Sequence, residues 1–531
     1  MNNKPTIGLK DLVFALIGST IGSGWLFAGL YAAQIAGPAA ILAWVLAGVI
    51  IFLFSLAYME LGIAFPVSGG AVKYSQFSHG SLVGYLAGFL SWLFYVMVAP
   101  LEVLAVIQYA TDYLPFLTKT RGSAADLTAS GLLVAGALLL AITALNLFSL
   151  RWVIRIHNGT VDWKLIVPAL TVILLFGLDF HPENFTAHGG LFPAGIPSVL
   201  TAIMAGGILY STFGFRVVVD LAGELENPQR DIPRAIAIGL CAVVVFYVLL
   251  QLAFIGALRP EDLKDGWAKL AFTDMTGPYA ALLMAAGLGW MAFVLYLDAI
   301  VSPLGTGIIF TTSTARITMA MAESHYFPAA LAPLDTQGVP SRAIWLNFAM
   351  GLILLAPLPD WQTIVSFGAS AIVLSFAFAQ ITLAAMHWRG LALPPGFRVR
   401  HVQWLAWFNC VMINCLLFAA GWQSNQVLLI AIGLGFLYYA GHRCSRREPL
   451  SRRELRSLPW MTCYLAWVFS SSWMGTFGGG TGWLTPVAGF SLQVLVTTVI
   501  YLWAVRSSLT REEMESEIRA AGLQPTGAAP R

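Results

Sequence analysis

The strongest constraint on the fold of this chain is a succession of fourteen long apolar segments, separated by short polar or basic stretches. About 20 apolar residues suffice for a helix to cross the hydrocarbon core of a bilayer. The chain is 58% hydrophobic and 10% charged over 531 residues, and no soluble core could bury that much apolar surface. The sequence therefore predicts an all-α polytopic membrane protein. The segments are 10–36, 38–65, 80–113, 126–148, 152–178, 197–223, 235–258, 277–312, 342–358, 361–388, 402–421, 424–441, 459–476 and 485–506.

Basic residues divide unevenly between the two sides of this predicted bundle. With the N-terminus inside, 22 of the 29 lysines and arginines are cytoplasmic and five are external, while two lie within segments. An excess of Lys and Arg in cytoplasmic loops sets the orientation of membrane proteins. We therefore expect both termini in the cytoplasm. The first apolar run is too long for a signal-peptide core and is interpreted as a first span.

Several classes of function lack support in the sequence. No HExxH, GxSxG or paired-carboxylate cluster occurs, so we predict no enzyme, no catalytic residue, no metal and no cofactor. The five cysteines form no CxxC motif and suggest neither a disulfide nor a metal framework. The basic run 443–456 is interpreted as a loop beside anionic lipid and not as a nucleic-acid site. Gly478–Gly482 lacks the Lys-Ser/Thr of a phosphate-binding loop and is interpreted as a turn.

Two of the apolar segments are interrupted by residues that are poor in a helix centre. The first contains Gly18-Ser-Thr-Ile-Gly-Ser-Gly24, and the sixth contains Gly206-Gly-Ile-Leu-Tyr-Ser-Thr-Phe-Gly-Phe-Arg216. Broken helices at membrane depth occur where the free backbone lines a ligand site. Breaks five segments apart favour an inverted repeat, with segments one to five and six to ten as its halves. The alternative for Gly18 and Gly22 is close helix packing through small residues.

At these motifs the chain resembles the amino acid–polyamine–organocation (APC) family of secondary transporters. The matching stretches run in order over about residues 8–390: Gly18–Gly24, Glu60–Gly70, Tyr210–Phe215, Glu224–Arg234, Ala315-Arg316, Phe327-Pro328 and Gly338–Pro340. Within the family, the fourteen-segment length and Trp163–Pro168 look most like bacterial aspartate:proton symporters. The resemblance implies a five-plus-five inverted-repeat, leucine-transporter-like fold in a bacterial inner membrane. It implies a core over 1–390, four additional helices over 391–510 and a cytoplasmic tail over 511–531.

The resemblance also implies which residues bind substrate. Half-helices beginning near Gly24 and Gly214 would direct their N–H groups at a carboxylate, while exposed carbonyls would accept the substrate ammonium. For each aromatic residue, ordinary interhelical packing is the alternative. The expected substrate-binding residues are Thr20, Ile21, Gly22, Ser23, Gly24, Tyr210, Ser211, Thr212, Phe213, Gly214 and Arg216, with Trp25 as a further aromatic candidate.

Lys164 is the expected proton-coupling residue. It lies nine residues after Arg155, about 13 Å along a helix, near the bilayer centre. Insertion of a lysine there costs about 2.5–3.5 kcal/mol, so such residues usually have a function. In proton-coupled members of the family, a lysine in the fifth helix takes the place of a sodium ion. The alternative is a fixed salt bridge to Glu102 or Asp298, which we interpret first as counter-ions.

Arg216 departs from the family pattern, in which an acidic residue commonly follows the Gly-Phe of the sixth helix. A cation in the first turn of a half-helix is unfavourable unless an anion faces it. One hypothesis is that Arg216 binds the side-chain carboxylate of a substrate such as aspartate. The other is an internal pair with Asp220, four residues further along the same helix.

The sequence thus predicts an amino acid permease that couples uptake to protons by alternating access. Its expected partners are an amino acid, protons and the lipid bilayer, with no nucleic acid and no obligate protein partner. An exchanger of the same fold is the first alternative, and it would not require Lys164 to titrate. A receptor that binds an amino acid without transporting it is the second.

Overall fold

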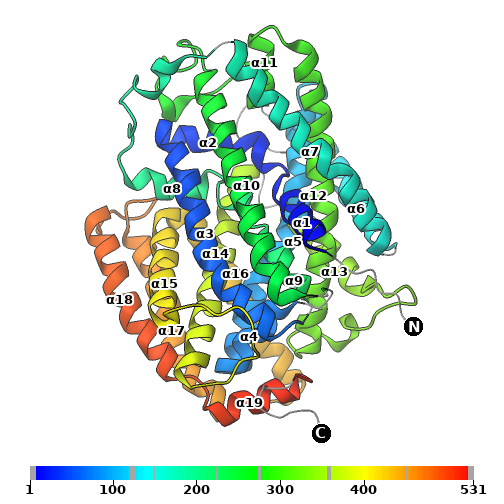
Figure 1. Cartoon of the computed structure of the whole chain (residues 1–531), viewed down its shortest axis with the longest axis vertical. Helices are drawn as coiled ribbons and strands as arrows, with labels where there is room; N and C mark the ends of the chain where they lie inside the picture. The colour runs from blue at the N-terminus through cyan, green and yellow to red at the C-terminus, as the bar shows by residue number, and fades with distance from the viewer. Residues whose placement is uncertain are drawn as a thin grey trace.

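The computed structural model describes residues 8–67, 69–119, 127–148, 150–178, 180–222, 225, 227–272, 277–355, 360–449 and 451–523. Ser68, Glu224 and Glu226 of the family motifs, and tail residues 524–531, lie outside the described residues, as does the side chain of Arg155. Within the described residues the fold is helical and contains no β-strand (Figure 1).

Every predicted apolar segment coincides with a helix or with a pair of helices. The helices of the first ten segments are α1 Leu9–Thr20, α2 Gly24–Ala36, α3 Ala40–Ala64, α5 Ser81–Ala110, α6 Ala129–Asn146, α7 Leu150–Leu178, α8 Pro197–Ala205, η4 Tyr210–Thr212, α9 Phe215–Asp220, α10 Pro228–Gly256, α11 Pro278–Ala285, α12 Gly289–Glu323, α13 Ser341–Leu355 and α14 Trp361–Trp388. The later ones are α15 Val402–Ala420, α16 Trp422–Ser445, α17 Arg452–Met474 and α18 Pro486–Arg506, and the short helices α4 Gly70–His79 and α19 Arg511–Ala520 lie between or after spans.

Among the described residues, ten helical stretches are long and apolar enough to cross a membrane, one of them running from Gly24 to Ala64. The count of fourteen spans therefore remains a prediction. The eighth predicted segment, 277–312, divides at Gly287, whose φ of +77° few other residues adopt. Its main part, α12, continues to Glu323, beyond the predicted end.

The centre of the bundle is α5, which is buried from Leu82 to Tyr109. It packs against α12, α14 and α4. Surrounded by protein along its whole length, α5 can place a charged residue at the middle of the molecule without exposing that residue to lipid. Glu102 occupies this position.

The first and sixth segments are both broken, and the two breaks touch. Between α1 and α2, Ile21 has an extended backbone (φ −85°, ψ 94°). Between α8 and α9, Gly207 has a φ of +84°. A Cβ on Gly24 would collide with the Ser211 side chain, and one on Gly214 would collide with that of Thr20. The glycines therefore allow the two interrupted helices to meet.

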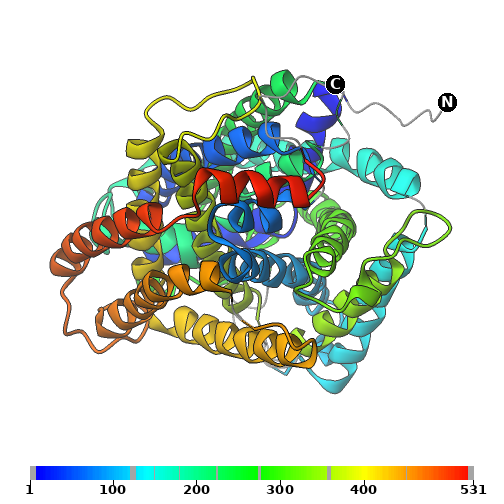
Figure 2. The same cartoon turned by 90° about the horizontal axis from the view of Figure 1, so that it is seen from below.

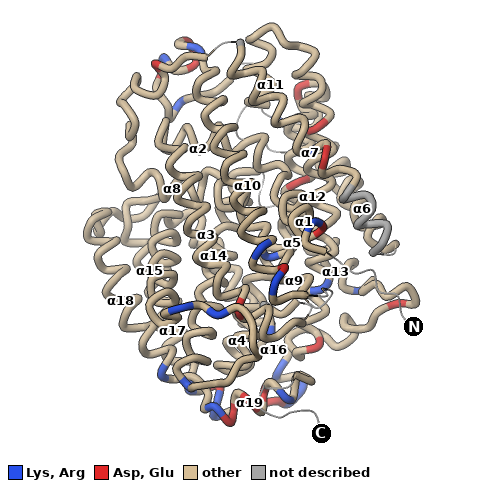
Figure 3. The backbone as a smooth tube through the Cα atoms, viewed as in Figure 1, with Lys and Arg blue, Asp and Glu red and all other residues tan. Residues whose placement is uncertain are grey.

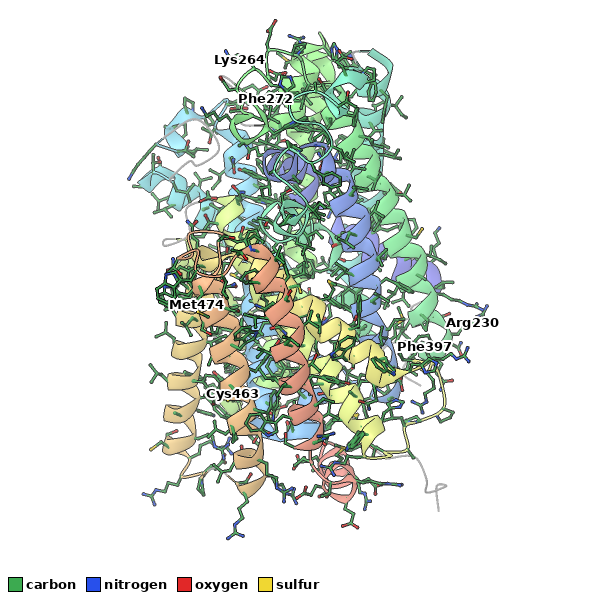
Figure 4. The ribbon with its side chains drawn as sticks, turned by 90° about the vertical axis from the view of Figure 1, so that its left-hand side faces the viewer. Arg230, Lys264, Phe272, Phe397, Cys463 and Met474 are labelled. Atoms are coloured by element: carbon green, nitrogen blue, oxygen red, sulfur yellow. The ribbon has the colours of Figure 1, made fainter. Side chains whose placement is uncertain are left out.

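The last helices form a side layer of the molecule. In Figure 2 these helices, α15 to α18, yellow to orange-red, lie along the left and lower edges of the molecule, and Figure 4 shows α15 and α18 side by side. The C-terminal helix α19 crosses the end of the bundle and packs on α4. It buries Met514 and Ile518, and Glu513 pairs with Arg456 of α17 at 3.3 Å. In Figure 3, Lys and Arg gather at this end of the molecule.

Candidate functional site

The free N-terminus of α2 is occupied by a carboxylate from the central helix. The backbone N–H of Ser23 donates to Glu102 Oε2 at 2.8 Å, and the Tyr210 hydroxyl donates to the other carboxylate oxygen. The Ser23 hydroxyl accepts a hydrogen bond from Trp361 Nε1 at 2.8 Å. The α2 terminus, η4, α5 and α14 thus converge on one point, where the positive end of a helix favours an anion.

Lys164 reaches the other side of the same break. Its Nζ donates to the carbonyl oxygen of Gly18 at 2.8 Å and to the Thr306 hydroxyl at 2.7 Å. Thr306 Oγ1 in turn lies 3.2 Å from the carbonyl oxygen of Ile21. The ammonium of Lys164 therefore satisfies the Gly18 carbonyl near the end of α1, and Thr306 satisfies that of Ile21.

Glu102 and Asp298, the expected counter-ions, make their closest contacts elsewhere. No ion pair joins either carboxylate to Lys164 among the described residues, although all three side chains are fully buried. Asp298 accepts hydrogen bonds from Trp25 Nε1 at 3.0 Å and from the Ser302 hydroxyl at 2.6 Å. Trp25 is thus a hydrogen-bonding partner of Asp298 as well as a packing residue.

Aromatic rings line the break on the α9 side. Phe213 packs edge-on against Phe94 at 4.4 Å between ring centroids, and lies 5.3 Å from Phe310 and 5.7 Å from Tyr210. The hydroxyls of Ser211 and Thr212 bond to carbonyls of their own segment, those of Gly207 and Ile208. In this structure, those two hydroxyls stabilise the irregular turn.

Arg216 is fully buried in a cage of aromatic rings. Its guanidinium carbon lies 4.6 Å from the ring centroid of Tyr58, with the rings of Tyr95 and Phe376 near 6 Å. One nitrogen donates to the Tyr58 hydroxyl at 3.2 Å, whereas Nε and Nη2 have no hydrogen-bond partner. The internal pair with Asp220, the second of the two hypotheses, is not formed: Asp220 accepts from the Tyr95 hydroxyl at 3.0 Å, and its Oδ1 has no hydrogen-bond partner.

The structure therefore brings together most of the predicted residues and adds others. Thr20, Ile21, Gly22, Ser23 and Gly24 meet Tyr210, Ser211, Thr212, Phe213 and Gly214 at the touching breaks, with Lys164 and Glu102 against them. Sequence reasoning missed Thr306 and Trp361. The small residues around Thr306, in Gly305-Thr-Gly307 of an apolar segment, were an available signal. For Trp361, the sequence offered no comparable signal.

This arrangement can bind a zwitterion and move a proton without covalent chemistry. A helix N-terminus binds a carboxylate, carbonyls bind an ammonium, and two carboxylates and an amine can exchange protons. No cluster of metal-ligating side chains occurs in the part of the chain that the structure describes.

Comparison with known proteins gives the family. A profile described as amino acid permease matches residues 7–439. The chain is 35% identical over 519 residues to the glutamate/serine transporter AimA of Bacillus subtilis, covering 96% of this chain and 95% of the relative. It is 32% identical over 517 residues to the aspartate-proton symporter of the same organism, covering 97% and 98%.

A more distant relative is the aromatic amino acid transport protein AroP of Escherichia coli K12, 26% identical over 462 residues and covering 81% of this chain and 95% of the relative. The first two relatives match nearly the full length, so the similarity extends through α15 to α18. These relatives are transporters and not enzymes. The chain belongs to the amino acid permease family of multi-pass membrane transporters.

Proposed function

We propose that this protein imports an amino acid across the bacterial inner membrane together with protons, by alternating access. The observation that carries the proposal is the position of Lys164, whose ammonium bonds the Gly18 carbonyl inside the break of the first segment. A cation held by carbonyls at this point stabilises the broken helix. Loss of its proton would weaken that support, because a neutral amine bonds a carbonyl less strongly than an ammonium does, so protonation would be coupled to the shape of the site.

The substrate we propose is an acidic amino acid such as aspartate. Two names among the relatives support it, a glutamate/serine transporter and an aspartate-proton symporter. Arg216 supports it as well, since two of its donors are buried without a partner. Burying a guanidinium without an anion costs free energy. The side-chain carboxylate of the substrate would form charge-assisted hydrogen bonds with those donors.

The proposal also includes how the chain is divided and how it is oriented in the membrane. Residues 1–390 would form the transport core as two inverted repeats of five helices, with four further helices over 391–510 and a cytoplasmic tail over 511–531. Both termini would face the cytoplasm. The support is the distribution of charge and the pair of broken helices.

Reconstitution in proteoliposomes tests the function. We expect labelled aspartate to accumulate when an inward proton gradient is imposed on vesicles that contain no amino acid. An exchanger would give flux only when the vesicles are loaded with substrate, and a receptor would bind aspartate without any flux. Either result would replace the proposal by the corresponding alternative.

A further inference from the structure

An apolar groove of about 350 Å³ lies between the ends of three helices in the side layer. The end of α14 contributes Trp388, the first turns of α15 contribute Trp404 and Trp407, and the last turns of α18 contribute Tyr501, Leu502 and Arg506. Grooves of this size bury a substantial part of a small-molecule ligand. Figure 4 views the molecule from the side on which α15 and α18 lie in front.

Hydrogen bonds between the helices fix the walls of the groove. Trp407 Nε1 donates to the Thr498 hydroxyl at 2.8 Å, and the Tyr501 hydroxyl donates to the carbonyl oxygen of Gln403 at 2.9 Å. The polar atoms of Trp407 and Tyr501 are thus satisfied by the protein itself. What remains for an occupant is an apolar surface, and it is open, because Trp404 is 70% and Trp388 is 54% exposed.

The mouth of the groove carries a positive charge. Arg506, the last residue of α18, is exposed, and none of the described carboxylates forms an ion pair with it. Its backbone carbonyl accepts a hydrogen bond from Arg389 at 2.8 Å, which anchors the end of α18 beside the end of α14. An apolar groove that ends at an unpaired guanidinium matches a molecule with an apolar chain and an anionic head.

We propose that this groove binds an anionic phospholipid of the cytoplasmic leaflet. One acyl chain would lie along Trp404, Trp407 and Leu502, and the phosphate would contact the Arg506 guanidinium. Tryptophan prefers the level of the headgroups, and basic pockets on the cytoplasmic side bind anionic headgroups. The choice of leaflet rests on the proposed orientation, with both termini in the cytoplasm. The site is separate from the broken helices, so the proposal does not depend on the transported substrate.

Native mass spectrometry of the full-length protein, offered equal amounts of phosphatidylglycerol and phosphatidylcholine, tests the proposal. We expect wild-type protein to retain phosphatidylglycerol preferentially and Arg506→Gln to lose about fivefold in that preference. Trp404→Ala should weaken retention of both lipids, because it removes the apolar wall and leaves the charge. Arg230→Gln is the matched control, an exposed arginine at the end of α10, outside the groove, and should behave as wild type.

Four results would overturn the proposal. The first is equal retention of the two lipids by wild-type protein. The second is an Arg506→Gln variant, folded by its melting temperature, whose lipid preference is unchanged. The third is a dimer without lipid that dissociates on Trp404→Ala, since a second copy would then cover the groove. Added inorganic phosphate should not displace the lipid, and displacement would assign the site to a free anion.

Discussion

The ammonium nitrogen of Lys164 lies 2.8 Å from the carbonyl oxygen of Gly18, 146 residues away in the chain. If this contact couples protons to transport, Lys164→Ala should abolish uptake driven by an imposed pH gradient while retaining part of the aspartate binding. The measurement is uptake into proteoliposomes at several pH gradients, with binding measured separately in detergent.

Lys264→Ala, in a loop at the opposite end of the molecule from α19, is the matched control and should transport normally (Figure 4). A Lys164→Ala variant that still concentrates aspartate with an unchanged dependence on pH would remove Lys164 from the coupling mechanism.

Arg216→Gln tests the choice of substrate. Since a hydrogen bond to a charged group contributes roughly 1.5–3 kcal/mol, loss of the guanidinium should weaken aspartate affinity by about tenfold or more. The affinity for a neutral amino acid should change much less. Competition against labelled aspartate measures both. If the two affinities fall together, or neither falls, Arg216 has a structural role in its aromatic cage.

Gly214→Ala tests the contact between the two breaks. The added Cβ would collide with Oγ1 of Thr20 and lie 2.9 Å from the Leu16 carbonyl oxygen. Overpacking of this kind costs about 1–3 kcal/mol, so the melting temperature in detergent and the uptake rate should both fall. Gly433→Ala in α16 meets no atom within 4 Å and should leave both unchanged. Equal melting temperatures for the two variants would show that the breaks separate easily.

Glu513→Gln tests the docking of α19. Partial burial opposes ionisation, but the Thr510 N–H and the guanidinium groups of Arg456 and Arg453 hold the pKa of Glu513 below its ordinary value. A carboxylate with a lowered pKa stabilises the docked helix above its unfolded pKa of about 4.3, and that stabilisation is lost as pH falls through the folded pKa. The protection factors of the amides over residues 511–520, corrected for the intrinsic exchange rate at each pH, should therefore fall in acid, in high salt and in the variant.

Glu512→Gln is the control for that experiment, because Glu512 is exposed on the same helix. At neutral pH, the amides over residues 511–520 of this variant should exchange at the wild-type rate. Exchange that is equally slow in the Glu513→Gln variant would mean that burial of Met514 and Ile518 holds α19 without the ion pairs.

Reporter fusions test the topology. With fourteen spans, fusions after residues 450 and 510 should report the cytoplasm, and a fusion at Gly480 should report the outside. A cytoplasmic signal from Gly480 would reduce the number of spans to twelve, because α17 and α18 would then not cross.

The sequence predicted the helices, the two breaks and the residues that gather at them, because apolar length and mid-span glycines are local signals. The sequence could not predict which residues form hydrogen bonds with them. The bond from Ser23 to Glu102 joins residues 79 apart, and that from Trp361 to Ser23 joins residues 338 apart, so neither follows from spacing. The two hypotheses for Arg216 both assumed an anion as its partner, whereas the structure surrounds it with aromatic rings, which also stabilise a buried cation.

If the cargo binds its carboxylate at the Ser23 amide, as we expect, the carboxylate of Glu102 already bonded there competes with the cargo. A tethered ligand acts at an effective concentration of about millimolar even for a flexible tether, and this concentration does not fall when cargo is scarce. On this hypothesis, a dilute amino acid would reach the amide only after Glu102 withdraws. Uptake at low supply would then depend on how often Glu102 releases the amide, and the idle carrier would keep its helix end satisfied and its site closed.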